Sequence, residues 1–168
     1  CPRAGGFSYA DMILNENHVV INLAHMKEVL QWDSVKGLMV VEPGVCFAEI
    51  FQMTLIHNWT LSSCPGGMGV TVGGAVSNNV HGKDSWKNGN FGEQVIQMKL
   101  MTASGEIIEI NRDQDQDLFE AVVGGAGLLG IIVEVTLQLR KVPSPFVEVT
   151  SVVTRDVGES LEQIEIYN

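Results

Sequence analysis

Three stretches of the sequence, residues 3–8, 65–82 and 124–130, are rich in glycine and poor in bulky side chains. Glycine lets backbone N–H groups come close to an anion, and it adopts conformations that other residues avoid. Pyrophosphate is a common ligand of such surfaces. Tight turns alone would explain one such stretch, but three of them in one small domain favour an anion-binding site.

The middle stretch is the most specific, because the signal for a helix start is followed by polar side chains. Thr71 is suited to cap a short helix over residues 72–74, and a helix N-terminus free of side chains attracts anions. The next polar residues, Ser77, Asn78 and Asn79, carry a hydroxyl and two amides. These groups can hydrogen-bond a polar heterocycle or a chain of hydroxyls.

Two known nucleotide-binding patterns do not fit the sequence. Residues 125–130 match G-x-G-x-x-G, but a helix is expected before them and a strand after them, the reverse of the dinucleotide-binding order. Gly82 and Lys83 are followed by Asp84, and the upstream glycine of a P-loop is missing. A Rossmann-type NAD site and a P-loop are therefore not predicted.

The elements that must position these stretches are strands and helices in mixed order. Short β-branched or alternating runs predict strands at residues 18–22, 38–41, 59–61, 95–100, 108–110 and 133–139. Ser104 and Gly105 mark the turn of a hairpin. One amphipathic helix is predicted from Phe47 to about His57, and a second is expected to be capped by Asp117.

The second helix would have Glu120 as the capping-box partner of its first residue and Leu118, Ala121 and Val122 as its apolar stripe. Residues 146–154 are predicted to form one more strand, and residues 161–167 fit either a helix or a strand. Mixed strands and helices with an antiparallel hairpin predict an α+β fold.

Composition excludes several classes of function. The chain has 168 residues, with 20 acidic and 10 basic side chains and a net charge of −10, and no cluster of Lys or Arg that would bind nucleic acid. No apolar run approaches the roughly 20 residues of a membrane helix. The three cysteines form no disulfide or zinc pattern, and no metal site is predicted.

Four motifs resemble, in order and spacing, those of the FAD-binding (PCMH-type) domain of the vanillyl-alcohol oxidase superfamily. Residues 3–11 are similar to R-G-x-G-x-S-Y-x-D, residues 41–45 to V-x-x-G-V, and residues 65–83 to P-G-x-x-x-V-T-V-G-G-A…H-G-K. Residues 117–132 are similar to D-L-F-x-A-x-x-G-G-x-G-x-x-G-I-I. Within the superfamily, the sequence most resembles aldonolactone and alditol oxidases and enzymes like decaprenylphosphoryl-ribose oxidase.

The resemblance implies a PCMH-type fold of mixed sheets flanked by helices, and it assigns residues to the cofactor. One side of the pyrophosphate would be bound by Ala4, Gly6, Ser8 and Tyr9, and the other side by Gly66, Gly67, Thr71, Gly73 and Gly74. The ribityl chain and isoalloxazine would lie along Ser77, Asn78, Val80, His81 and Gly82, and the adenosine and flavin edge near Ala126, Gly127, Gly130 and Ile132.

Two positions depart from the family pattern. Ala4 stands where a glycine is usual, and Phe7 stands where many members carry the histidine that bonds to the flavin. Phenylalanine cannot form that bond, so non-covalent FAD is predicted.

His81 and Lys83 are the candidate catalytic residues, because side chains two apart share a face of a strand-like stretch. They would lie on the substrate side of the flavin, where a cation stabilises the reduced ring. The alternative is a flavin-packing histidine and a solvated lysine.

The function implied by the resemblance is an FAD-dependent oxidoreductase. It would oxidise a hydroxyl of a sugar, sugar lactone or polyol-like substrate by hydride transfer to flavin N5, and pass the electrons to an acceptor. The alternative is a non-catalytic module that retains the flavin-binding fold. Residues 1–142 are expected to be the FAD-binding domain, and residues 143–168 the start of a linker or substrate domain.

The chain is further expected to be a fragment that lacks the first FAD subdomain segment and the substrate domain. The main acid or base would then lie outside it. The location is expected to be cytoplasmic.

Overall fold

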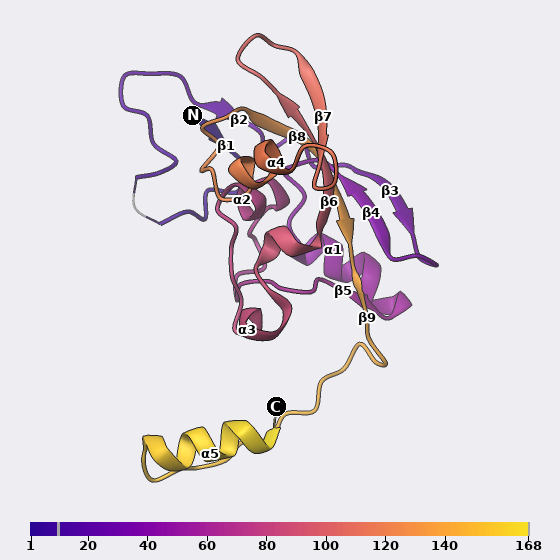
Figure 1. The fold of residues 1–168 in the computed structure, drawn as a ribbon, viewed down its shortest axis with the longest axis vertical. Helices are drawn as coiled ribbons and strands as arrows, with labels where there is room; N and C mark the ends of the chain where they lie inside the picture. Colours follow the sequence, from indigo (N-terminus) through magenta and orange to yellow (C-terminus); the bar gives the residue numbers. More distant parts are fainter. Residues whose placement is uncertain (10, 168) are drawn as a thin grey trace.

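The computed structural model describes residues 1–9 and 11–167. Its main feature is a five-stranded antiparallel sheet in the order β3-β4-β8-β6-β7 (Figure 1). The strands are β3 (Val29–Asp33), β4 (Leu38–Val41), β6 (Val95–Met101), β7 (Ile107–Asn111) and β8 (Ile131–Gln138). The antiparallel mixture of strands and helices confirms the predicted α+β class.

The helices and the two small sheets complete the fold. The helical elements are α1 (Phe47–Thr54), η1 (Leu55–His57), α2 (Val72–Ser77), α3 (Ser85–Asn88), η2 (Phe91–Gln94), α4 (Gln116–Val122) and α5 (Val157–Tyr167). The small sheets pair β1 (Pro2–Arg3) with β2 (Ile21–Asn22), and β5 (Trp59–Thr60) with β9 (Arg140–Lys141). Outside these elements the described residues form turns and loops, which include the three glycine stretches apart from Arg3 in β1 and the residues of α2.

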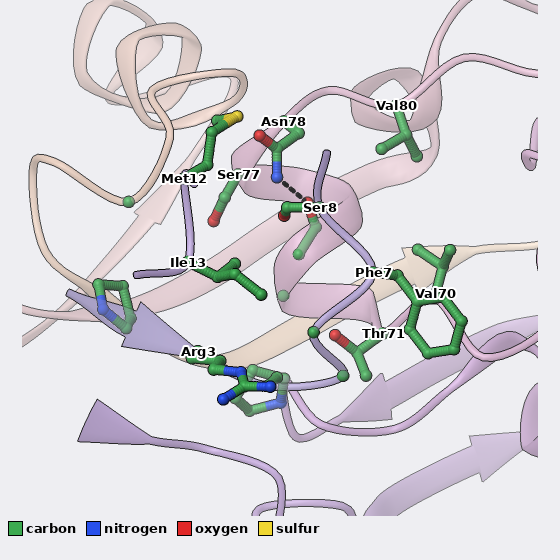
Figure 2. Close-up of a pocket in the computed structure, with 18 of the residues that line it drawn as sticks. Arg3, Phe7, Ser8, Met12, Ile13, Val70, Thr71, Ser77, Asn78 and Val80 are labelled. Atoms are coloured by element: carbon green, nitrogen blue, oxygen red, sulfur yellow. Dashed lines mark hydrogen bonds between the residues drawn. The ribbon is translucent and has the colours of Figure 1, made fainter. Parts of the chain in front are cut away.

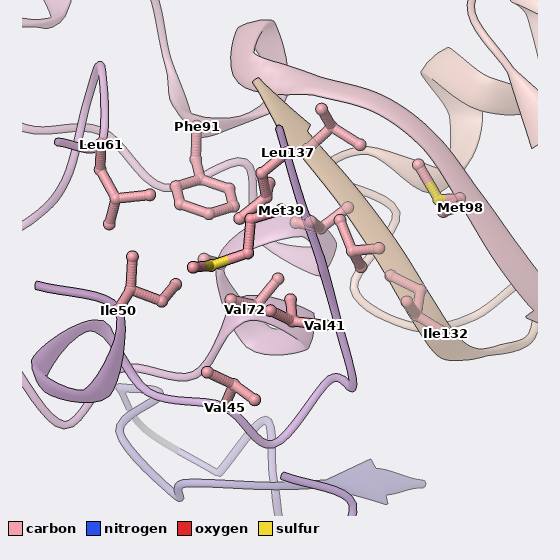
Figure 3. Packing of buried hydrophobic residues seen from close by; sticks show 14 of the residues in the cluster. Met39, Val41, Val45, Ile50, Leu61, Val72, Phe91, Met98, Ile132 and Leu137 are labelled. Atoms are coloured by element: carbon pink, nitrogen blue, oxygen red, sulfur yellow. The ribbon is translucent and has the colours of Figure 1, made fainter. Parts of the chain in front are cut away.

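One face of the main sheet packs against α1, α2 and α4 to form the hydrophobic core (Figure 3). Phe47 at the start of α1 stacks on Phe91 with ring centroids 5.3 Å apart. The largest fully buried side chains are Phe47, Phe91, Phe119, Met39, Ile50, Met98, Leu100, Ile110, Leu137, Val41, Val45 and Val72. Because α2 belongs to this core, the glycine stretch that contains it is held firmly against the sheet.

The predicted hairpin is confirmed, since β6 and β7 pair antiparallel around Ser104 and Gly105. The strand at 38–41 and the helix from Phe47 are also confirmed. The strand predicted at 133–139 begins earlier, at Ile131. Val135 and Leu137 are buried as its alternation predicts, but the next buried residue toward the start of the strand is Ile132 rather than Val133. The register shifts where β6 passes from Lys99 to Leu100, so a bulge turns the side chains around it and breaks the alternation.

Other expectations about the elements are wrong. The N-cap position of helix α4 is Asp115, which makes no side-chain capping bond, and Asp117 lies inside the first turn. Of the predicted apolar stripe, Val122 is buried and Leu118 packs against the core, whereas Ala121 is exposed and Phe119 is buried instead. Only Ile21 and Asn22 of the strand predicted at 18–22 are paired. Strand β3 was not predicted, because its run Val-Leu-Gln-Trp-Asp lacks a clean alternation.

Residues 146–154 form an exposed coil and not the predicted strand. Pro143 and Pro145 precede this segment, and no described strand lies beside it, so its β-branched residues have no sheet to join. Residues 161–167 belong to α5, which has no buried residue and stands apart from the rest of the chain in Figure 1.

Candidate functional site

A cavity of about 530 Å³ lies where the three glycine stretches meet (Figure 2). Its volume falls within the range of small-molecule and cofactor sites. All of the cofactor-binding residues expected from the sequence line this cavity, with the exception of His81 and Gly82. The structure therefore brings together residues that are spread from Ala4 to Ile132 in the sequence.

The first wall is the loop at residues 4–8, which continues from β1. Strand β1 pairs in parallel with β2, and the Arg3 carbonyl accepts a hydrogen bond of 2.7 Å from the N–H of Leu23. Gly6 has a φ of 72°, a conformation that favours glycine. The backbone N–H groups from Ala4 to Ser8 donate to no other described residue. They remain available to an anionic ligand.

The second wall is the stretch at residues 65–70, which is held by its carbonyl groups. The carbonyls of Met68 and Val70 accept hydrogen bonds from the N–H groups of Ala48 and Phe47 at the start of α1, at 3.0 and 3.1 Å. Within the described chain, the N–H groups of Gly66, Gly67 and Gly69 make no hydrogen bond. This wall thus also offers backbone donors, while the carbonyls of Met68 and Val70 are occupied.

Helix α2 begins after Thr71 as predicted, but its N-terminus is not the open anion site that the sequence suggested. The N–H of Val72 donates to the Val45 carbonyl at 2.9 Å, and the N–H of Gly73 donates to the Pro43 carbonyl at 2.8 Å. Thr71 makes no side-chain capping bond. The first turn is therefore docked on the loop after β4, which already satisfies two of its donors.

Gly73 has a packing role in this docking. A Cβ atom at Gly73 would lie 2.6 Å from the Pro43 Cβ, closer than side-chain atoms approach. Gly74, one residue further on, has more room, and within the described chain its N–H donates no hydrogen bond. The two glycines therefore serve different purposes, the first in packing and the second at the cavity surface.

The third wall is the turn at residues 124–130, which is fastened to the end of α2. The N–H of Gly124 donates to Val76, and the N–H of Ala126 donates to Ser77 at 2.7 Å. Ala126 has a positive φ of 52°, and Gly127 has a φ of 74°. Among the described residues, no hydrogen bond begins at the N–H of Gly127 or Gly130, so these too are free donors at the cavity.

Of the polar residues at the end of α2, two line the cavity and one stabilises a neighbouring part of the fold. Ser77 and Asn78 line the cavity, although the Asn78 Nδ2 also donates to the Gly74 carbonyl at 2.9 Å (Figure 2). Asn79, grouped with them in the sequence, instead accepts a hydrogen bond from the N–H of Gly92 through its Oδ1. Its side chain thus binds the start of η2, and Asn79 does not line the cavity.

His81 and Lys83 are exposed and lie in a coil and a turn, so the strand-like stretch expected to align them is absent. Gly82 between them is packed tightly, because a Cβ there would lie 2.4 Å from the Cys64 carbonyl. Its N–H donates to the Ser85 Oγ at 2.8 Å. A catalytic role for His81 and Lys83 stays a prediction.

Several lining residues were missed by reasoning from the sequence. Half of them are apolar residues outside the glycine stretches: Pro2, Met12, Ile13, Leu23 and Pro43. The sequence around these residues does not indicate a site, because an apolar residue in a loop can face either a ligand or the core. Arg3, in contrast, begins one of the motifs and could have been named.

Comparisons with known proteins identify the family of the chain. A model of the family described as FAD binding domain matches residues 1–111. The chain belongs to this family. It therefore shares the FAD-binding domain of flavoprotein oxidoreductases.

Three relatives illustrate the family. The chain is 34% identical to decaprenylphosphoryl-beta-D-ribose oxidase of Mycolicibacterium smegmatis, over 95% of this chain and 35% of the relative. It is 32% identical to L-gulonolactone oxidase of Mus musculus, over 80% and 30% of the two chains. It is 36% identical to L-galactono-1,4-lactone dehydrogenase 2, mitochondrial, of Oryza sativa subsp. japonica, over 82% and 23%. The chain thus spans about a third or less of the length of these relatives.

The residues of the cavity fit FAD. The free N–H groups come from three walls and converge on one space, as an anionic pyrophosphate requires. The apolar side chains Met12, Ile13 and Val70 offer surfaces on which flat rings can pack. The hydroxyl of Ser77 and the amide of Asn78, at the C-terminal end of α2, add polar side chains to the lining (Figure 2).

Proposed function

We propose that this chain forms the FAD-binding part of an FAD-dependent oxidoreductase that oxidises a hydroxyl of a sugar, sugar lactone or polyol-like substrate. The observation that carries the proposal is the cavity whose three walls supply unpaired backbone donors, in a chain of the FAD binding domain family. The names of the three relatives, a ribose-derivative oxidase, a gulonolactone oxidase and a galactonolactone dehydrogenase, support the substrate class.

The chain's own residues would hold the cofactor mainly through the backbone. Loop 4–8 and the glycines Gly66, Gly67 and Gly127 would donate N–H groups to the pyrophosphate oxygens, and Ser77 would offer its hydroxyl to the polar chain of the cofactor. FAD supplies the two-electron chemistry when it is bound, since it can accept a hydride equivalent from a substrate C–H bond. The protein supplies binding, orientation and electrostatics.

None of the described residues that line the cavity is Asp, Glu, His or Lys, the side chains that most often act as general bases. His81 and Lys83, one and three residues after the lining residue Val80, remain the candidates predicted from the sequence. The electron acceptor, the cytoplasmic location and the domain division at residue 142 stay predictions. In the described residues, no helix is both long and apolar enough to cross a bilayer.

We also propose that the FAD is bound without a covalent link through the loop at residues 4–8. Phe7 occupies the position at which many family members carry a bonding histidine. Its ring lies against Gly69, where a Cβ atom would come within 2.4 Å of it. A phenyl ring offers no nucleophilic nitrogen, so the loop can hold the flavin only by contact.

The test is the visible absorbance of the purified protein, recorded before and after denaturation. The proposal predicts a flavin spectrum, and it predicts that denaturation releases free FAD. Anaerobic mixing with sugar lactones, aldoses and polyols should then bleach the flavin for at least one of these classes. A colourless protein that also fails to take up added FAD would overturn the proposal, whereas a stable flavin that no substrate bleaches would favour the non-catalytic module.

A further inference from the structure

We propose that Arg3 is a positioning residue that pairs its guanidinium with the pyrophosphate of bound FAD. The inference rests on the proposed function and deepens it, because it names the charge that anchors the cofactor. Arg3 lines the cavity (Figure 2). It is the only residue with a full charge at neutral pH among the described residues that do so.

The guanidinium lies over the loop whose donors are free. A Cβ atom at Gly6 would lie 3.0 Å from the Arg3 Nη2 and 3.4 Å from its Nε. The charged group is thus next to the unpaired N–H groups of residues 4–8. Among the described residues, Arg3 forms no ion pair and its side chain donates no hydrogen bond. Its five N–H donors are therefore available to a ligand.

The backbone of Arg3 is fixed even though its side chain is exposed. Its carbonyl accepts the N–H of Leu23 at 2.7 Å, and the residue pairs with Asn22 in the small parallel sheet. The preceding residue, Pro2, lies against Gly127 on the opposite wall, where a Cβ atom would come within 2.9 Å of the Pro2 Cγ. The side chain thus starts from a defined position at the junction of two walls.

The negative net charge of the chain explains why a cationic side chain would help to bind FAD. The chain has a net charge of −10, and this field disfavours an anionic ligand. Backbone N–H groups bring dipoles but no net charge. A guanidinium matches two phosphate oxygens at once and adds a full positive charge at the point where the cofactor is negative.

The experiment measures the affinity of the full-length protein for FAD, ADP and riboflavin, for the native protein and for Arg3→Gln and Arg3→Lys. Arg140→Gln is the matched control, because Arg140 is exposed on β9 outside the cavity lining. Titrations are run at low and high salt. Circular dichroism and thermal melting establish that each variant is folded.

The expected result is that Arg3→Gln weakens FAD and ADP binding by about tenfold or more at low salt, the loss of one charge-assisted contact. Arg3→Lys keeps the charge but not the paired donors, so it should lose less affinity than Arg3→Gln, and the loss in Arg3→Gln should shrink at high salt. Arg140→Gln should bind like the native protein. Riboflavin, which has no phosphate, should respond to no variant.

Two outcomes overturn the inference. One is an Arg3→Gln protein that binds FAD and ADP as tightly as Arg140→Gln does. The other is an equal, salt-independent loss in Arg3→Gln and Arg3→Lys, which would mean that the side chain only shapes the loop. Failure of the proposed function has a different signature, since the native protein would then take up no FAD at all.

Discussion

Replacing Gly73 by alanine tests whether α2 is docked on the loop after β4 as closely as the structure indicates. The new Cβ would lie 2.6 Å from the Pro43 Cβ, and ordinary contact begins at about 3.4 Å, so the helix or the loop must move by nearly 1 Å. This movement also strains the 2.8 Å hydrogen bond from the Gly73 N–H to the Pro43 carbonyl.

The size of the effect follows from two opposing contributions. Overpacking a well-packed site costs about 1–3 kcal/mol. Alanine in a helix is better than glycine by about 0.5–1 kcal/mol, which offsets part of that cost. We expect the free energy of unfolding to fall by about 1–2 kcal/mol and the Tm by about 2–8 °C for a chain of this size.

The assay is thermal and denaturant unfolding of Gly73→Ala beside Gly74→Ala, which makes the same change one residue later in the same helix. At Gly74 the nearest atom to a Cβ is the Thr71 Oγ1 at 3.3 Å, so a small shift of one side chain suffices. Gly74→Ala should therefore be as stable as the native protein or slightly more stable. A Gly73→Ala protein at least as stable as Gly74→Ala would refute the close docking of α2.

Three further predictions concern the cofactor and pH. Gly127→Ala should weaken FAD binding, because Gly127 has a φ of 74° and an added Cβ would lie 2.9 Å from the Pro2 Cγ; flavin fluorescence titration measures this, and unchanged affinity would contradict it. Acid precipitation of the native protein should leave all flavin in the supernatant, whereas a flavin adduct found by mass spectrometry on the denatured chain would disprove non-covalent binding.

The third prediction is that Asp33 stabilises the fold only while it is ionised. Backbone hydrogen bonds from Lys36 and Val35 lower the pKa of Asp33 below its usual value. The stabilisation is thus present above the unfolded pKa of about 3.9 and is lost as pH falls through the folded pKa. Denaturant melts of the native protein and Asp33→Asn should differ at pH 7 and converge at low pH; a gap that stays constant with pH would argue against this origin.

Much of the candidate cofactor site could be predicted from the sequence, because the glycines and turn signals that shape its backbone can be recognised there. The glycines of all three walls, the start of α2 after Thr71 and the β6–β7 hairpin each have local signals, and the structure contains them. Their convergence on one cavity was expected from the family resemblance and not from any local rule.

What reasoning from the sequence missed depends on contacts between distant residues. Asn79 carries an amide that could bind a ligand, but its Oδ1 accepts a hydrogen bond from the N–H of Gly92. The docking of α2 depends on Pro43 and Val45, which lie far from it in the sequence. Val133 continues a perfect alternation, yet the register shift against β6 moves the buried position to Ile132. No local pattern contains the information for such tertiary choices.

The loop at residues 4–8 is joined to the rest of the protein through the two-residue pairing of β1 with β2 and through contacts across the cavity. A ligand in the cavity would touch this loop and both other walls at once, and so would act as a cross-link between residues 4–8 and residues more than a hundred positions away. Ligand binding would then raise the energy needed to open the loop at residues 4–8. Cleavage by proteases within this loop should consequently slow as the cavity fills.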